Sequence, residues 1–150
     1  MKLGIMTGGT PGVEGTVKNL IALAQDVEER GFSTLWMAHI RGQDAPMLLA
    51  LAGSKTERIE LASAVTPIQP RHRVALAQQA LTASAMSGGR FTLGIGLSHK
   101  VVIEDMYGLR FDRPAKTMQP YLDVVLPLLN RQTARVDRCL IPGQHGAGCS

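Results

Sequence analysis

The chain has 150 residues, of which 45% are hydrophobic and 19% are charged, and it carries a formal net charge of +4. This length permits one domain with a buried core, and this composition is typical of globular proteins rather than of disordered chains. No apolar run approaches the roughly 20 residues that cross a bilayer, no signal peptide is recognisable, and the positive charge does not follow one face as nucleic-acid binding requires. We therefore expect a cytoplasmic protein with no nucleic-acid and no membrane partner.

Apolar runs and amphipathic stretches alternate along the chain and predict four βα units. Runs bounded by glycine, serine or proline predict strands over residues 2–6, 34–37, 59–65 and 91–95. Apolar residues at helical spacing predict helices that begin near residues 16 and 44, one that ends at 86, a short one over 100–106 and a last one over 117–129. Residues 66–70 are expected to form a stiff extended loop.

Capping residues mark several of the expected helix ends. Thr16 and Asp44 are suitable N-caps, because their side-chain oxygens can accept hydrogen bonds from the first helical turn. Gly31 follows the first helix at the position where a left-handed residue often ends a helix. Pro127 lacks the N–H that a helix interior needs, so we expect it to kink or shorten the last helix.

The repeated βα order predicts the class of fold. Strands that alternate with helices favour a parallel sheet with helices packed on its outside. Two closures are compatible with this pattern: an open doubly wound sheet, or half of an eight-stranded (β/α) barrel, which typically takes about 250 residues. Composition and periodicity do not choose between them.

The stretch 91–98 combines an expected strand with a glycine turn. The strand runs into Gly94-x-Gly96, where the missing side chains let a backbone or a ligand approach closely. This turn lies at the carboxyl end of its strand, which is where parallel α/β folds bind their ligands. The stretch is not a dinucleotide-binding fingerprint, because His99 takes the place of its third glycine. Residues 7–15 are not a P-loop, because they lack its Gly-Lys-Ser/Thr ending.

Three motifs together resemble those of the bacterial-luciferase-like oxidoreductases. They are Ser-Gly-Gly-Arg-Phe-x-Leu-Gly-Ile-Gly at 87–96, Phe-Asp-Arg-Pro at 111–114 and Ala-Val-Thr-Pro at 64–67. Their order and spacing agree over residues 1–130, and the chain looks most similar to the branch that uses coenzyme F-420. The resemblance implies an α/β fold of the TIM-barrel type, of which residues 1–130 would form the first four of eight βα units.

The resemblance also implies an activity and a cofactor. It implies an oxidoreductase that catalyses hydride transfer or monooxygenation of a small-molecule substrate. The cofactor would be F-420 or, alternatively, flavin mononucleotide (FMN), bound at the carboxyl ends of the barrel strands. In such enzymes the protein holds the ring, tunes it and excludes water.

The cofactor-binding candidates come from the same resemblance. In the family the third strand ends in a bulge with a non-prolyl cis peptide behind the cofactor ring, and the matching bond is Ala64–Val65. Gly94, Gly96 and Ser98 match the turn that approaches the cofactor. Backbone N–H groups and a serine hydroxyl in such a turn can donate hydrogen bonds to ring carbonyls or to a phosphate.

His39 is the candidate catalytic residue. It follows the second expected strand, where the family often places an Asp-His pair near the ring, and an imidazole can exchange a proton near neutral pH. A hydrogen-bonded structural histidine at a strand end fits the sequence equally well. The aspartate that many relatives have before this histidine is Ala38 here.

Residues 131–150 follow neither a helical nor a strand pattern. Both cysteines, Cys139 and Cys149, lie there, so the preceding chain has no disulfide framework and no Cys-x-x-Cys motif, and we predict no metal site. We expect an irregular tail, disordered or aberrant, on a truncated family member.

Truncation leaves other functions open. A half-barrel has unpaired strand edges, which could lead to a homodimer, and the alternative function is that of a non-catalytic half-barrel fragment. A doubly wound nucleotide-binding domain is a third hypothesis, but it lacks a phosphate-binding fingerprint.

Overall fold

The computed structural model describes residues 1–8, 17–40, 42–136 and 139–141. The chain divides into two compact units. The first comprises Met1–Pro67 and Gln79–Gly96, and the second comprises Ile68–Gln78 and Leu97–Ser150. Among the described residues, no helix is long and apolar enough to cross a membrane.

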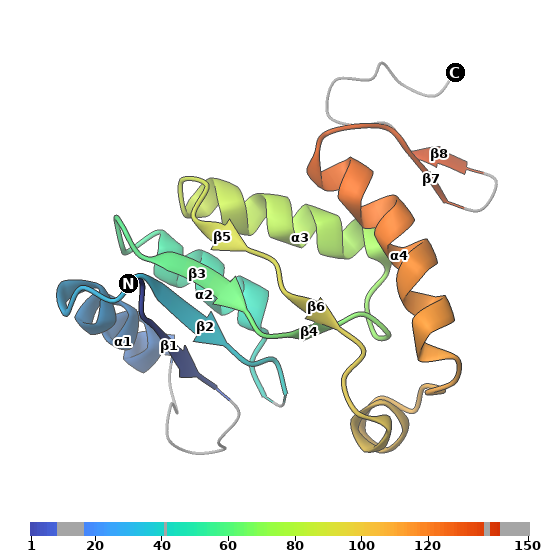
Figure 1. The fold of residues 1–150 in the computed structure, drawn as a ribbon, viewed down its shortest axis with the longest axis horizontal. Coiled ribbons are helices and arrows are strands. Elements are labelled where there is room, and N and C mark those ends of the chain that lie inside the picture. The colour runs from blue at the N-terminus through green and yellow to red at the C-terminus, as the bar shows by residue number, and fades with distance from the viewer. Residues whose placement is uncertain (9–16, 41, 137–138, 142–150) are drawn as a thin grey trace. The chain divides into compact units, whose positions relative to one another are not determined.

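A four-stranded parallel sheet forms the centre of the first unit. Its order is β1 (Gly4–Thr7), β2 (Thr34–Met37), β3 (Glu60–Ser63) and β5 (Phe91–Thr92). Each strand pairs in parallel with the next, so all four carboxyl ends lie at one edge of the sheet (Figure 1). The parallel sheet that the βα pattern predicts is therefore confirmed.

Alternate residues of the sheet build the core of the first unit. The register aligns Ile5, Leu35, Leu61 and Phe91 across the four strands. This row packs with buried residues of α1 (Val17–Glu29) and α2 (Ala45–Gly53), including Leu20, Val27 and Leu49. Strand side chains alternate between the two faces of a sheet, and on the opposite face Met6 and Trp36 are 62% and 37% exposed.

The helix signals of the first unit are mostly confirmed. Asp44 caps α2, because its Oδ1 accepts a hydrogen bond from the Met47 N–H at 3.0 Å. Gly31 has a φ of +80° just beyond α1, as expected for a residue that ends a helix. The expected cap Thr16 lies outside the described residues.

The strand expected over 91–95 is wrong in one respect, since it is split in two. Phe91–Thr92 belongs to the main sheet as β5, whereas β6 (Ile95–Gly96) pairs in parallel with β4 (Thr66–Pro67) in a separate two-stranded sheet. Residues 66–67 are therefore a strand and not part of a loop. The split occurs because the backbone of Gly94 bonds to the Ser63 hydroxyl and to the Thr66 N–H rather than continuing the β3–β5 ladder.

The second unit contains a π-helical turn, η1 (Val102–Met106), the helix α4 (Pro114–Leu129) and a hairpin. The helix α3 (Arg73–Met86) begins in this unit and continues into the first. Ala77 of α3 packs with Val124 and Leu128 of α4 and with Ala134.

Pro127 does not shorten α4, which ends at Leu129 as expected, and a kink at this proline stays a prediction. One expectation for this unit is wrong. The chain after residue 130 is not irregular throughout. It contains β7 (Ala134–Val136) and β8 (Cys139–Ile141), which pair antiparallel and satisfy each other's backbone groups.

Glu28, near the end of α1, holds the chain that leads into β3. Its carboxylate accepts hydrogen bonds from the backbone N–H groups of Glu57, Arg58 and Ile59 at 2.6–3.2 Å. Burial alone would raise the pKa of this carboxyl, but these three N–H groups and the charge of Arg58 outweigh it and hold the pKa below its usual value of 4.5.

We expect Glu28→Gln to destabilise the protein in a pH-dependent way. A carboxyl with a lowered folded-state pKa contributes stability above its unfolded pKa and loses it as the pH falls through the folded value. The variant should therefore unfold about 1 kcal/mol more easily at pH 7, with a difference that shrinks below pH 4.5. Urea unfolding over this pH range measures it. The exposed neighbour provides the control, since Glu29→Gln should change stability by under about 0.5 kcal/mol. A difference that grows towards low pH would contradict this account.

Candidate functional site

The carboxyl edge of the first unit brings two of the predicted segments together. The Thr66 N–H donates to the Gly94 carbonyl at 2.8 Å, which places the chain after β3 beside the chain after β5. The Ala64–Val65 peptide bond is cis, as the family resemblance implied. A Cβ added at Gly96 would lie 2.5 Å from Val65 Cγ2. Ala64, Val65, Gly94 and Gly96 are therefore neighbours at this edge.

Glycine is required at position 94 because a side chain would collide with a neighbouring strand end, and not because of the φ angle of its backbone. A Cβ there would overlap the carbonyl oxygen of Ser63. The Ser63 side chain also donates to the Gly94 carbonyl at 2.9 Å and accepts from the Gly94 N–H at 3.0 Å. Ser63 is a site residue that the sequence reasoning missed, and the one available signal was a serine at the end of a buried strand.

Thr66 leaves a buried hydroxyl without a hydrogen-bond partner at this edge. Its side chain is 0% exposed, and Oγ1 has no partner among the described residues. A buried hydroxyl usually finds a partner, since leaving it unpaired costs about 1–3 kcal/mol. An orphaned polar group beside a glycine backbone without side chains is compatible with a polar, planar ligand at this edge.

His39 lies at the carboxyl end of β2 and holds the start of α2. Its Nδ1 accepts a hydrogen bond from the Ala45 N–H at 3.1 Å, one of the first-turn donors that have no partner within a helix. A neutral imidazole that accepts at Nδ1 carries its hydrogen on Nε2. The end of β2 also adjoins the cis peptide at Ala64–Val65, because the Ala64 N–H donates to the Met37 carbonyl at 2.8 Å. His39 therefore has a structural contact through Nδ1.

The structural role of His39 predicts a difference between two substitutions. His39→Ala removes the acceptor for Ala45 and should lower the free energy of unfolding by about 1 kcal/mol. His39→Asn keeps an acceptor near the position of Nδ1 and should retain most of that stability. Urea unfolding of the two variants measures the difference. Equal losses in both would show that the bond to Ala45 contributes little.

Ser98 belongs to the second unit, so it is described apart from the four residues above. It has a φ of +60°, a left-handed conformation that is uncommon outside glycine. In the same unit, the Gln69 Nε2 donates to the carbonyl of Leu97 at 2.7 Å. The residue before Ser98 is therefore held by a side chain that the sequence reasoning did not identify.

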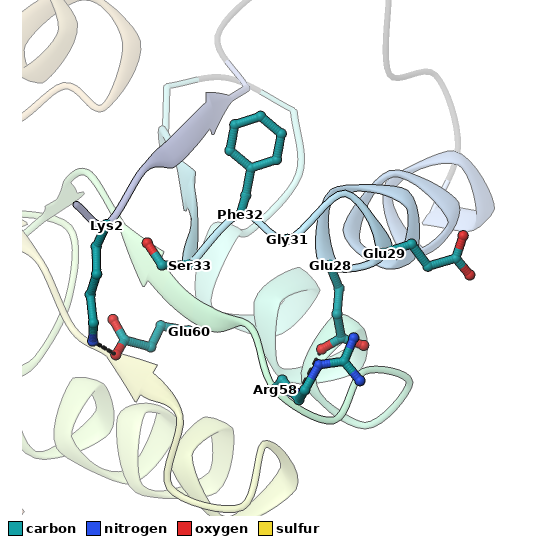
Figure 2. A pocket seen from close by; sticks show the side chains of 8 residues that line it. All are labelled: Lys2, Glu28, Glu29, Gly31, Phe32, Ser33, Arg58 and Glu60. Atoms are coloured by element: carbon teal, nitrogen blue, oxygen red, sulfur yellow. Dashed lines mark hydrogen bonds and ion pairs between the residues drawn. The ribbon is translucent and has the colours of Figure 1, made fainter.

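A cavity of about 310 Å³ opens at the opposite, amino end of the sheet. Figure 2 shows its lining residues, Lys2, Glu28, Glu29, Gly31, Phe32, Ser33, Arg58 and Glu60. Several of its charges already have partners: Lys2 Nζ lies 3.5 Å from Glu60 Oε1, and Glu28 binds backbone N–H groups. These contacts tie the strand starts together, which is a role in stability rather than in catalysis. Among the described residues, no three His, Cys, Asp or Glu side chains gather as metal ligands would.

Comparison of the sequence with known proteins gives one family and longer relatives. A family model described as luciferase-like monooxygenase matches residues 1–145. The chain is 37% identical over 135 residues to Rv3520c of Mycobacterium tuberculosis, whose name describes a coenzyme F-420-dependent oxidoreductase. The match covers 89% of this chain and 38% of that relative, so this chain spans about two fifths of the relative's length.

Solved structures with the same fold are also longer. The F-420-dependent tetrahydromethanopterin reductase of Methanopyrus kandleri superposes with a TM-score of 0.74 at 23% identity, covering 87% of this chain and 40% of its own. The oxygenating component of 3,6-diketocamphane monooxygenase from Pseudomonas putida, in complex with FMN, gives 0.78 at 19% identity, covering 94% and 44%. These likenesses show the fold, which is that of the first units of a TIM barrel, and they confirm the predicted fold class.

Proposed function

The chain belongs to the luciferase-like monooxygenase family, and on that premise we propose that it is an oxidoreductase with coenzyme F-420, or alternatively FMN, at the carboxyl edge of its sheet. Residues 1–130 are proposed to be the amino-terminal half of the barrel. F-420 is preferred because the relative at 37% identity is named for it. The reaction class is hydride transfer or monooxygenation of a small molecule.

The observation that supports this proposal best is the composition of the carboxyl edge. Gly94 and Gly96 let the chain after β5 pack directly against Ser63 and Val65, beside the cis Ala64–Val65 peptide. A flat heterocyclic ring bound at this edge needs hydrogen-bond partners from backbone and hydroxyl groups for its carbonyl and N–H groups. The buried Thr66 hydroxyl, which has no partner among the described residues, is one such group. When bound, the ring supplies the hydride or oxygen chemistry.

The chain's own groups would orient the ring and move protons. The backbone N–H and the hydroxyl of Ser98 are proposed to donate to ring carbonyls or to the phosphate tail. Gly96, which belongs to the β4–β6 ladder, is proposed to contact the ring through its backbone. His39 is proposed to hold or transfer a proton at Nε2, since its Nδ1 accepts from the Ala45 N–H. In any reaction that the wild-type chain supports, His39→Asn should lower kcat and leave the Kd of the cofactor unchanged.

A titration of the 150-residue chain tests the proposed function. F-420 and FMN are added separately, and the fluorescence of each cofactor is followed. The proposal predicts saturable one-to-one binding of F-420, FMN or both. Absence of binding from a sample with native far-ultraviolet circular dichroism would contradict it and would favour the non-catalytic half-barrel.

A further inference from the structure

Ser63 satisfies both backbone groups of Gly94 with one hydroxyl. Its Oγ donates to the Gly94 carbonyl at 2.9 Å and accepts from the Gly94 N–H at 3.0 Å. The side chain is 0% exposed, so water does not compete for these bonds. In an ordinary parallel ladder, backbone groups of the neighbouring strand would take this role. Here the Ser63 side chain takes it for the Gly94 N–H, while the Gly94 carbonyl also accepts from the Thr66 N–H, and this fixes Gly94 where the chain passes from β5 to β6.

Gln69 makes a comparable contact three residues further along, within the second unit. Its Nε2 donates to the Leu97 carbonyl at 2.7 Å, immediately before the left-handed Ser98. The remaining oxygen of this amide is buried and has no partner among the described residues. This short hydrogen bond from a partly buried amide holds the plane of the Leu97–Ser98 peptide in one orientation.

We propose that Ser63 and Gln69 are positioning residues for cofactor binding. Each acts within its own unit, Ser63 through the backbone of Gly94 and Gln69 through the Leu97 carbonyl, and not by touching the cofactor itself. This inference rests on the proposed function, because the segment they hold is the one proposed to donate hydrogen bonds to the ring. The position of the residues that touch the cofactor would then depend on Ser63 and Gln69, which lie outside the three motifs that resemble the family.

The physical argument concerns the freedom of glycine. Gly94 and Gly96 have more accessible backbone conformations than other residues, so a segment that contains both is not rigid by itself. Hydrogen bonds from Ser63 remove that freedom at Gly94, and in the second unit the bond from Gln69 fixes the Leu97 carbonyl. Without the Ser63 hydroxyl, the half-buried Gly94 N–H loses its partner, and the direction of the N–H groups that follow it is no longer fixed.

The test compares two buried serines of the first unit. Ser63→Ala removes the hydroxyl that holds Gly94. Ser87→Ala removes a hydroxyl that is 1% exposed and donates to the Ser84 carbonyl at 3.1 Å, at the end of α3. Amide hydrogen exchange of the cofactor-free chain reports the contact directly. We expect the Gly94 amide to exchange at least about tenfold faster in Ser63→Ala and to be unchanged in Ser87→Ala.

Cofactor affinity and a spectroscopic signature complete the test. With F-420 or FMN as the probe, Ser63→Ala should raise the Kd about tenfold, as expected for one lost hydrogen-bonded contact. The visible circular dichroism of the bound ring should change at saturation, since this signal follows the orientation of the ring and not the stability of the fold. Ser87→Ala should leave both unchanged.

Gln69→Glu provides a second variant that keeps the size of the side chain. It replaces the donor Nε2 with an oxygen that repels the Leu97 carbonyl, and it should also raise the Kd about tenfold. Unchanged Kd and unchanged circular dichroism in both Ser63→Ala and Gln69→Glu would overturn the positioning role while the proposed function stands. If the wild-type chain binds neither cofactor, the proposed function fails and the positioning role fails with it, whereas the exchange result still decides whether Ser63 fixes Gly94.

Discussion

Gly94→Ala is expected to abolish cofactor binding and to lower the free energy of unfolding by about 3 kcal/mol. The added Cβ would overlap the Ser63 carbonyl oxygen, and a backbone atom cannot rotate away as a flexible side chain can. The chain after β3 or the chain after β5 must therefore move. Either movement breaks the bonds between Gly94 and the Ser63 hydroxyl. Urea unfolding and a titration with F-420 and FMN measure the two effects.

Gly31→Ala is the matched control for this substitution. Gly31 has a φ of +80° and nothing within 4 Å of the position of an added Cβ. Its replacement should therefore cost only the conformational strain of a left-handed alanine, about 1 kcal/mol, and should leave cofactor affinity unchanged. If Gly94→Ala costs no more than Gly31→Ala and still binds the cofactor, the close packing at the carboxyl edge is not what holds the site.

Arg90→Lys is expected to destabilise the first unit by about 3 kcal/mol although it keeps the positive charge. The guanidinium of Arg90 donates to the carbonyls of Gly53, Thr56 and Ile59 at 2.7–2.9 Å and to the Thr56 hydroxyl at 3.2 Å. It thereby joins the end of α2 to the chain that leads into β3. The ammonium group of a lysine cannot reach all of these acceptors, because its three N–H donors are all on one nitrogen atom.

Thermal or urea unfolding of Arg90→Lys provides the measurement. Arg110→Lys is the control, since Arg110 is exposed and a surface exchange of this kind should change stability by under about 0.5 kcal/mol. Equal stability of the two variants would show that the bonds from Arg90 are replaced by water in the folded protein.

Local patterns were sufficient to predict the helices and the main sheet. The spacing of apolar residues in 17–29, the Asp44 cap and the glycine after α1 each act within a few residues, and each is found where expected. The register of the sheet then follows from burial, because Ile5, Leu35 and Leu61 must share one face. These elements depend on local chemistry and on a single buried face.

The departures have two different causes, one a contact between residues far apart in the sequence and one a local pairing. The division of 91–95 into two strands requires the Ser63 side chain to replace a ladder bond at Gly94. The hairpin of β7 and β8 is stabilised by pairing and has no strand periodicity to reveal it. Neither Ser63 nor Gln69 is of a residue type, or lies in a sequence motif, that marks a functional site. The sequence alone therefore could not distinguish them from other polar residues.

The central claim is that the carboxyl edge of the first unit forms a cofactor-binding face, and mapping of the bound cofactor by nuclear magnetic resonance tests it most directly. Amide chemical shifts of the nitrogen-15-labelled chain are recorded without cofactor and at saturation with F-420 or FMN. The account predicts the largest changes at Ala64, Val65, Gly94 and Gly96. Largest changes around the amino-end cavity, or no changes at all, would contradict it.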